Sequence, residues 1–301
     1  MNKSNTFFIT VLLCPSLMAS EPVEQKYNAS ISIGEEYNSN LTIDELDLGS
    51  NQSGLLTNIE LEVDAQLSPS KDHQINLAYM FSRSIHEEYS EFDLESHGFS
   101  LGYDFTEGDY TYGLDYMFFD ATLDSADFLQ MNFITPSVSY MLNDTSLLRF
   151  AYNFTDKSFD TFTDRDADSN GVDISYYSFF NQAKSYFRWQ LSTAQEDAVT
   201  DEFDFDSYTV GFSVNSTVPS LAEGAKVNFD IKYSERDYSQ RTEEIMAFRA
   251  EEWSQVRLNL IVPIYENMTL DFGVEHNDRA SNLASADYTE TRAMVDFIYE
   301  F

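Results

Sequence analysis

The sequence predicts an all-β protein that folds as a single antiparallel, up-and-down transmembrane β-barrel of about fourteen strands. Three observations predict this class. Apolar side chains recur at every second position, the segments that connect these runs alternate between short and long, and aromatic residues are abundant, with 25 Phe and 19 Tyr against 6 Pro and 11 Gly. A transmembrane barrel combines all three, because each strand alternates between a lipid-facing and an inward-facing side.

The alternation marks about fourteen candidate strands. Val63 and Ala65, for example, fall on one face of an extended chain, whereas Glu62 and Asp64 fall on the other. The same pattern occurs within residues 29–33, 59–67, 75–81, 99–105, 110–118, 134–142, 148–154, 172–176, 187–191, 208–214, 227–233, 256–262, 270–274 and 288–301. An even number of strands returns both ends of the chain to the same side of the membrane.

The connectors predict which end of the barrel faces outward. Short turns are expected at residues 68–72, 106–109, 143–144, 181–184, 219–225 and 265–267, and longer ones at 44–54, 84–93, 123–127, 160–170, 196–205, 239–250 and 278–287. Short periplasmic turns and longer, acidic extracellular loops are typical of such barrels. Pro136 and Pro263 each remove a backbone donor, so we expect a bulge or a strand end at both.

The last strand of the chain resembles the terminal strand of bacterial outer-membrane β-barrels. Phe297, Tyr299 and Phe301 lie in step on its apolar face, and the chain ends on the last aromatic ring. The resemblance implies that this strand is the assembly signal, that it closes the barrel, and that the partners are the barrel assembly machinery and periplasmic chaperones. The alternative is an edge strand of a soluble β-sandwich.

The N-terminus predicts export. Lys3 precedes an apolar run from Thr6 to Leu13 and a small-residue region that ends at Ser20, which is typical of a secretory signal peptide at residues 1–20. The barrel is then expected to occupy residues 21–301, in the outer membrane of a Gram-negative bacterium. The single cysteine, Cys14, falls inside the signal. Lipidation at Cys14 is the alternative, although Leu13 is larger than the residue that a lipoprotein signal prefers before its cysteine.

Charge excludes nucleic acid as a partner. The formal net charge is −35, and removing Lys3, the only charge of the predicted signal, lowers it by one to −36. Most carboxylates fall in the predicted long loops, and no basic patch is present. Two interpretations stay open: a solvated surface in a saline habitat, or loops that bind divalent cations beside anionic lipopolysaccharide.

One segment could bind Ca²⁺. Asp166, Asp168 and Asn170, followed by Gly171, match the first half of a calcium-binding loop, in which oxygens at alternate positions converge before a sharp turn. The second half departs from that pattern, because Tyr177 stands where a bidentate Glu is required. No other cofactor is expected.

The sequence gives no support for an enzyme. Of the four histidines, His276 lies two residues from Asp278, so the two share a strand face, yet no nucleophile motif such as G-x-S-x-G accompanies them. We expect a surface pair without catalytic chemistry.

Charged side chains on the face opposite the aromatic residues should line the lumen. The predicted lining charges are Glu60, Glu62, Asp64, Asp104, Asp115, Arg149, Arg188, Lys232, Arg257 and Arg292. Acids dominate the early strands and bases the later ones. Opposed walls of this kind create a transverse field in a water-filled pore, or form salt bridges in a narrow one. Because the mouths are acidic, modest cation preference is expected.

Short polar motifs suggest a narrower family. Residues 37–40, 235–237, 281–282 and 287–292, together with Phe301, resemble the C-terminal barrel of surface lipoprotein assembly modifiers. The resemblance implies a fourteen-stranded barrel that helps to move lipoproteins to the cell surface. In that family a periplasmic helical-repeat domain precedes the barrel, whereas here only about six residues separate the predicted signal from the first strand.

Two functional classes remain open at this point. The first is a conduit across the outer membrane, either a porin-like transport channel or an accessory for an exported substrate. The second is a structural or adhesive barrel whose lumen is plugged and whose acidic loops bind cations, in contact with outer-membrane lipid and lipopolysaccharide.

Overall fold

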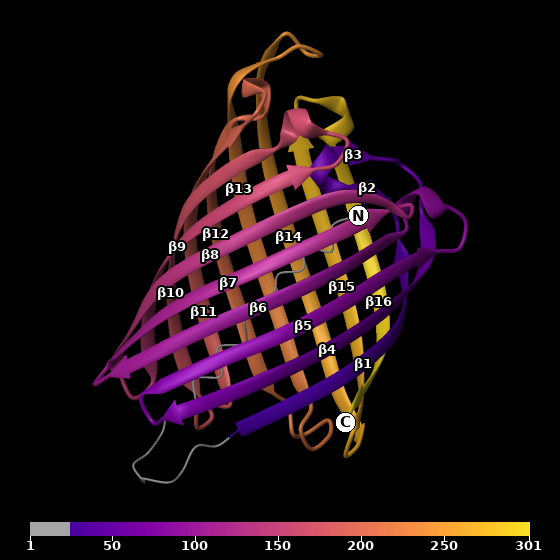
Figure 1. Ribbon diagram of the computed structural model, residues 1–301. Coiled ribbons are helices and arrows are strands. Elements are labelled where there is room, and N and C mark those ends of the chain that lie inside the picture. The colour runs from indigo at the N-terminus through magenta and orange to yellow at the C-terminus, as the bar shows by residue number, and fades with distance from the viewer. Residues whose placement is uncertain (1–24) are drawn as a thin grey trace.

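Fourteen strands form one closed antiparallel barrel in the computed structural model, which describes residues 25–301. Each strand pairs with its neighbours in sequence, and the last strand, β16, returns to pair with the first, β1 (Figure 1). The predicted fold class is therefore confirmed. The predicted signal peptide and Cys14 lie outside the described residues.

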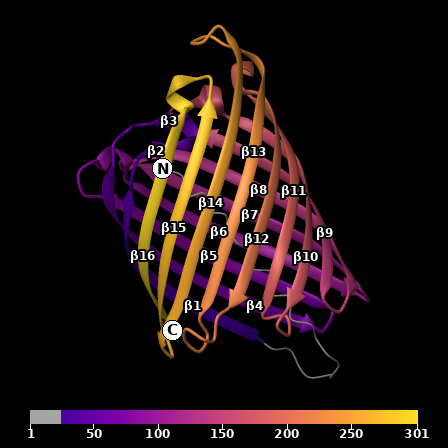
Figure 2. The same cartoon turned by 180° about the vertical axis from the view of Figure 1, so that it is seen from behind.

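The barrel strands are long and steeply tilted (Figure 2). They are β1 (Gln25–Asn38), β4 (Gly54–Ser70), β5 (His73–His86), β6 (Leu94–Glu107), β7 (Tyr110–Leu123), β8 (Ala126–Asn143), β9 (Ser146–Phe159), β10 (Ala167–Phe180), β11 (Ser185–Ala198), β12 (Phe205–Thr217), β13 (Lys226–Thr242), β14 (Ala247–Tyr265), β15 (Met268–Ser281) and β16 (Tyr288–Glu300). Two short strands, β2 (Thr42–Ile43) and β3 (Leu48–Gly49), form a separate small sheet.

Single turns of 3-10 helix occur only in connections at one end of the barrel, within the described residues. They are η1 (Asp44–Leu46), η2 (Ser90–Phe92), η3 (Thr163–Arg165), η4 (Asp201–Phe203) and η5 (Ala284–Ala286). We call this the loop end and the opposite end the turn end. Among the residues described, no helix is long and apolar enough to cross a membrane.

The connections sort to the two ends as predicted, but their lengths correct the prediction in two places. The β7–β8 connection at the loop end is a tight turn at Asp124 and Ser125, both with positive φ, as in a two-residue hairpin. The connection predicted at residues 239–250 is mostly strand, and only residues 243–246 separate β13 from β14. The longest connection is that of residues 39–53, at the loop end, whereas residues 218–225 form a comparatively long connection at the turn end.

The two prolines behave differently. Pro263 sits beside a register shift between β14 and β15, so the predicted bulge is present. Pro136 pairs with Leu114 in unbroken register between β7 and β8, so the prediction of a bulge or strand end there is wrong. Pro136 faces outward. The β8–β9 ladder lacks pairs at Thr135 and Pro136, as expected where proline has no N–H to donate, and it resumes at Ser137 without a change of register.

Apolar side chains cover the outside of the barrel. Leu114, Trp189 and Leu191 are each more than half exposed, and they alternate with inward-facing polar residues along their strands. A soluble protein rarely leaves a continuous apolar surface of this kind in water. The outer surface therefore matches a hydrocarbon environment, which argues against the soluble sandwich.

The terminal strand closes the barrel. Nine residue pairs join β16 to β1, including Tyr299 with Ile31 and Phe297 with Ile33, all on the outer face. The Phe301 amide donates a hydrogen bond to the Ala29 carbonyl at 2.9 Å, and the Tyr299 and Phe301 rings are 5.0 Å apart. The predicted assembly signal thus occupies the closing seam.

Deletion of Tyr299 to Phe301 should block assembly, because it removes ladder bonds at the seam together with apolar outer surface. The expected result is loss of the folded species that migrates differently on gels before and after boiling. Tyr299→Phe, which keeps the ring and the backbone bonds, should assemble normally. Accumulation of the deletion variant as a heat-modifiable barrel in membranes would contradict the role of the seam.

Candidate functional site: the lumen and its inner loop

All the predicted lumen charges lie on inward-facing sides of their strands. The cross-strand register places Glu62 beside Ser30 and Met80, and places Arg188 beside Ser213 and Tyr177. The complete set is Glu60, Glu62, Asp64, Asp104, Asp115, Arg149, Arg188, Lys232, Arg257 and Arg292. Acids on β4 and β6 therefore oppose bases on β11 and β13, whereas Arg149 on β9 lies only two strands from Asp115 on β7.

The basic wall is only partly neutralised. Arg257 lies 3.8 Å from Glu275, and Arg292 lies 2.7 Å from Glu290. In the part of the chain that the structure describes, no carboxylate lies within ion-pair distance of Arg149, Arg188 or Lys232; Arg188 donates instead to the Ser213 hydroxyl. A transverse field therefore survives across the lumen, since Arg188 and Lys232 face the side that carries the acids of β4 and β6.

The lumen is filled with side chains toward the loop end and less densely filled farther from it. Glu62 points inward yet is exposed, so its surroundings leave room for water. Toward the loop end the inward-facing Arg279, Glu290 and Glu251 are almost completely buried, at 1%, 1% and 4% exposure. The connection of residues 39–53 accounts for this burial.

Residues 39–53, which we call the inner loop, fold across the loop end of the barrel. Leu41 and Ile43 are buried against Phe128 and Phe159 on the far wall, in one apolar cluster with Phe92 and Leu129. Backbone hydrogen bonds from Leu41 to Gln52 and from Ser50 to Leu41 hold the two arms of the loop together. The inner loop therefore contains apolar residues because they pack into a cluster with residues of the barrel wall.

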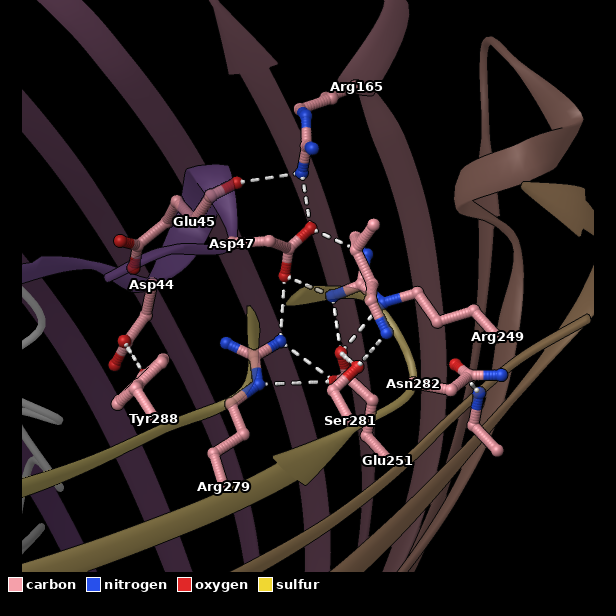
Figure 3. Close-up of polar contacts among 12 residues, drawn as sticks. Asp44, Glu45, Asp47, Arg165, Arg249, Glu251, Arg279, Ser281, Asn282 and Tyr288 are labelled. Atoms are coloured by element: carbon pink, nitrogen blue, oxygen red, sulfur yellow. Dashed lines mark hydrogen bonds and ion pairs between the residues drawn. The ribbon is translucent and has the colours of Figure 1, made fainter. Parts of the chain in front are cut away.

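Asp47 clamps the inner loop to three arginines. Its carboxylate accepts hydrogen bonds from Arg165 at 2.7 Å, Arg249 at 2.9 Å and Arg279 at 2.7 Å, which come from three different elements (Figure 3). Glu251 bridges the same two strand arginines, accepting from Arg249 Nε at 2.7 Å and from Arg279 Nη2 at 2.8 Å. We call these five residues the Asp47 clamp.

Two further contacts extend the clamp. Arg165 also donates to the backbone carbonyl of Glu45 at 3.3 Å, and the Tyr288 hydroxyl donates to Asp44. Burial alone would raise the pKa of Asp47, but hydrogen bonding and charge from Arg249, with Arg279 and Arg165, hold that pKa well below its usual range. Asp47 therefore stays ionised wherever its arginine partners are charged.

A second polar network lies at the closing seam. Glu290 accepts hydrogen bonds from Asn38 at 2.7 Å, Asn277 at 3.0 Å and Arg292 at 2.7 Å. Glu36 accepts from Asn58 at 3.1 Å and lies 3.9 Å from Arg292. All are buried, so side chains rather than water fill the lumen here.

The calcium prediction is wrong about local structure. Asp168 and Asn170 lie in the regular strand β10 and face outward, whereas Asp166 accepts a hydrogen bond from the Phe159 amide. Asn170 accepts from the Tyr152 hydroxyl. The three side chains do not converge. Among the described residues, no group of three or more His, Cys, Asp or Glu side chains is arranged to hold a metal ion.

His276 and Asp278 do not pair. Both face outward on β15, where the His276 ring contacts the Thr291 hydroxyl at 2.8 Å and Asp278 accepts from Thr289 at 3.5 Å. Neither residue points into the lumen, and the expected surface pair is instead two separate cross-strand contacts.

Two cavities lie at the loop end. One, of about 190 Å³, lies between the loop and the strands from β8 to β15, and Asp44, Glu45, Arg236, Trp253 and Arg279 are among its lining residues. The other, of about 510 Å³, is lined by residues of the loop-end connections such as Glu202, Glu243 and Leu283. Arg165 and Phe203 line both, so they separate the two spaces.

Sequence reasoning missed the Asp47 clamp. The signal that could have found it is the rarity of bases: 17 Lys and Arg stand against 52 Asp and Glu, yet Arg165, Arg249 and Arg279 lie in or beside acidic loops. Apolar Leu46 within the predicted loop at residues 44–54, with Ile43 just before it, was a second signal.

No protein-family model matches the chain, and no curated protein matches it significantly. Its fold is similar to that of solved outer-membrane barrels. A loop L8 deletion mutant of OmpT, an outer membrane protein of Vibrio cholerae, aligns at TM-score 0.56 and 8% identity over 92% of this chain and 99% of that one. An anion-selective porin from Comamonas acidovorans aligns at 0.53 and 9% over 93% and 100%. OccAB3 of Acinetobacter baumannii aligns at 0.51 and 10% over 91% and 99%. The chain therefore has a porin-like outer-membrane β-barrel fold.

Asp47→Asn should release the inner loop, because it removes one anion from between two buried arginines and the half-buried Arg165, a type of change that costs about 3–5 kcal/mol. Hydrogen exchange of peptides spanning residues 39–53 should accelerate, while exchange of the barrel strands stays slow. The matched control is Asp164→Asn, an exposed acid next to Arg165. Unchanged protection in the Asp47 variant would show that the apolar cluster alone holds the loop.

Acid should not open the loop above about pH 4. A carboxyl whose folded-state pKa is lowered contributes stability above its unfolded pKa, and that contribution is lost only as the pH falls through the folded value. Because the pKa of Asp47 is held well below its usual range, protection of residues 39–53, corrected for intrinsic exchange, should be equal at pH 7 and pH 4.5. Loss of protection in that interval would contradict the clamp.

Proposed function

We propose that this protein is a channel for small hydrophilic solutes in the outer membrane of a Gram-negative bacterium, with the inner loop restricting its outer mouth. In this proposal the loop end faces outward, beside lipopolysaccharide, and the turn end faces the periplasm. Insertion by the barrel assembly machinery is part of the proposal, because the aromatic terminal strand forms the seam.

The observation that carries the proposal is the opposition of charged walls inside a closed barrel. Arg188 on β11 and Lys232 on β13 face the side of the lumen that carries Glu62 and Asp104, and the exposure of Glu62 supports the presence of water between them. A protein that only needed a stable scaffold would gain little from unpaired charges in its interior.

A structural or adhesive role is the alternative, and the filled loop-end half of the lumen favours it. An accessory role in export, as the resemblance to surface lipoprotein assembly modifiers implies, has one supporting observation: two residues of the motif segments adjoin the inner loop. Asn38 accepts a hydrogen bond from the Asn40 amide, and Arg236 lines the smaller cavity.

Reconstitution in planar bilayers tests the channel. The wild type should conduct with modest cation preference that fades at high salt, because charge at the acidic mouths reaches only about 10 Å at 0.1 M salt. Replacing both Arg149 and Arg188 with Gln should raise the cation-to-anion permeability ratio about twofold or more, because both are unpaired. The Arg257→Gln exchange should act in the same direction but less strongly, since Arg257 already faces Glu275.

The matched control is Arg83→Gln, an arginine on the outer face of β5, which should leave the ratio unchanged. Folded, inserted protein without conductance, even as Asp47→Asn, would favour the structural alternative. Clear anion preference of the wild type would show that the basic wall outweighs the acidic mouths.

A further inference from the structure

The cavity of about 190 Å³ beneath the inner loop has an excess of hydrogen-bond donors on its barrel side. Arg236 lines it, stacks on Phe205 with its guanidinium 4.7 Å from the ring centre, and has no carboxylate within ion-pair distance in the described part of the chain. Its cross-strand neighbour Glu251 is already engaged by Arg249 and Arg279. Within the described residues, Arg236 therefore has aromatic neighbours but no carboxylate partner.

Trp253 adds to this excess. Its indole Nε1 is buried and has no hydrogen-bond acceptor, and the same is true of Arg279 Nη1. Three cationic groups, from Lys232, Arg236 and Arg279, each lie 5.9 Å from the Trp253 ring centre. Buried donors are rarely left without acceptors, so an anionic group on a ligand is favoured on this side.

The inner loop forms the opposite side of the cavity, and it carries acid. Asp44 and Glu45 both line the cavity. Asp44 accepts a hydrogen bond from Tyr288, whereas the Glu45 carboxyl has no cationic partner at contact distance, and burial raises its pKa. The remaining lining acids are satisfied, since Asp47 is in the clamp and Glu196 lies 2.6 Å from Lys157.

One unpaired cation and one unpaired acid therefore line the same small space from opposite sides. Each is costly while it stays unpaired, and they do not meet each other at ion-pair distance. A ligand that carries both an anionic and a cationic group satisfies both at once. The volume lies below the roughly 300–1,000 Å³ of pockets that take drug-sized ligands, so the ligand is small.

We propose that this cavity binds a small amino-acid-like zwitterion, with its carboxylate on Arg236 and its ammonium group on Glu45. The inference rests on the proposed channel function and names a solute class for it. Phe203, Phe205 and Trp253 line the cavity and offer apolar surface to the rest of the ligand. Selectivity among inorganic ions is a separate property, because it depends on the charge of the whole mouth.

The chain offers a direct optical test, because it contains only two tryptophans. Trp189 faces outward and is 55% exposed, so Trp189→Phe leaves Trp253 as the sole indole reporter without touching the lumen. Titration of refolded Trp189→Phe protein with L-phenylalanine should give a saturable fluorescence change. Binding should be at least about tenfold tighter than for 3-phenylpropionate or phenethylamine, each of which lacks one of the two charged groups.

Two substitutions test which residue binds the carboxylate and which binds the ammonium group of the ligand. Arg236→Gln should weaken phenylalanine and phenylpropionate about tenfold and leave phenethylamine unchanged, whereas Glu45→Gln should weaken phenylalanine and phenethylamine and leave phenylpropionate unchanged. Arg83→Gln, on the outer face, and Glu107→Gln, at the turn end, are controls that should change none of the three. Hydrogen exchange of residues 39–53 verifies that the loop remains in place in each variant.

Absence of a saturable response, or equal affinity for phenylalanine and phenylpropionate, would overturn the zwitterion site. The failure is distinguishable from failure of the channel, since fluorescence reports binding in detergent and conductance is measured separately. A protein that conducts without binding phenylalanine loses only the site, whereas one that binds it without conducting keeps the site and loses the channel.

Discussion

The position of the inner loop depends on one buried carboxylate. Asp47 brings together Arg165, Arg249 and Arg279, which belong to a connection and two strands, so a single anion ties the loop to both sides of the mouth. Without it, Glu251 would be the only carboxylate of the clamp, and it contacts Arg249 and Arg279 but not Arg165. The burial of Arg249 and Arg279, the wall of the smaller cavity and the narrowing of the lumen all follow from this contact.

The sequence was sufficient for the barrel because strand alternation is a local signal. Leu61, Val63 and Ala65 must share a face wherever the strand lies, and the same holds for each of the predicted strands. The face of each residue followed too, since an error of one residue would turn every apolar side chain inward. Inward charges such as Arg149 and Asp115 were therefore placeable before any contact was known.

The inner loop could not be predicted in the same way, because its contacts are between residues far apart in the chain. Asp47 lies more than two hundred positions from Arg249, and no periodicity relates the two. A loop rich in Asp and Glu has the composition of a solvated segment, and only its neighbours show that it is buried. The calcium prediction failed for a related reason: alternate oxygens at Asp168 and Asn170 fit an Asx-rich loop, but they fit an outward strand face equally well.

Because basic residues are scarce in this chain, their positions show which acids are buried and paired. In a chain of net charge −35, acids on the outer face meet other acids, as Asp168 does between Asp156 and Asp197, and this is tolerable only where water and salt screen them. Inside the barrel screening is weaker, so a buried acid needs charged or neutral donors. Lys157, Arg249, Arg279 and Arg292 supply charged ones, whereas Asp173 accepts hydrogen bonds from Ser175, Gln190 and Ser192. An inward base without a carboxylate partner, such as Arg236, differs from these paired bases. The physical argument that explains the pairs therefore also identifies Arg236 as a residue that can bind the anionic group of a solute.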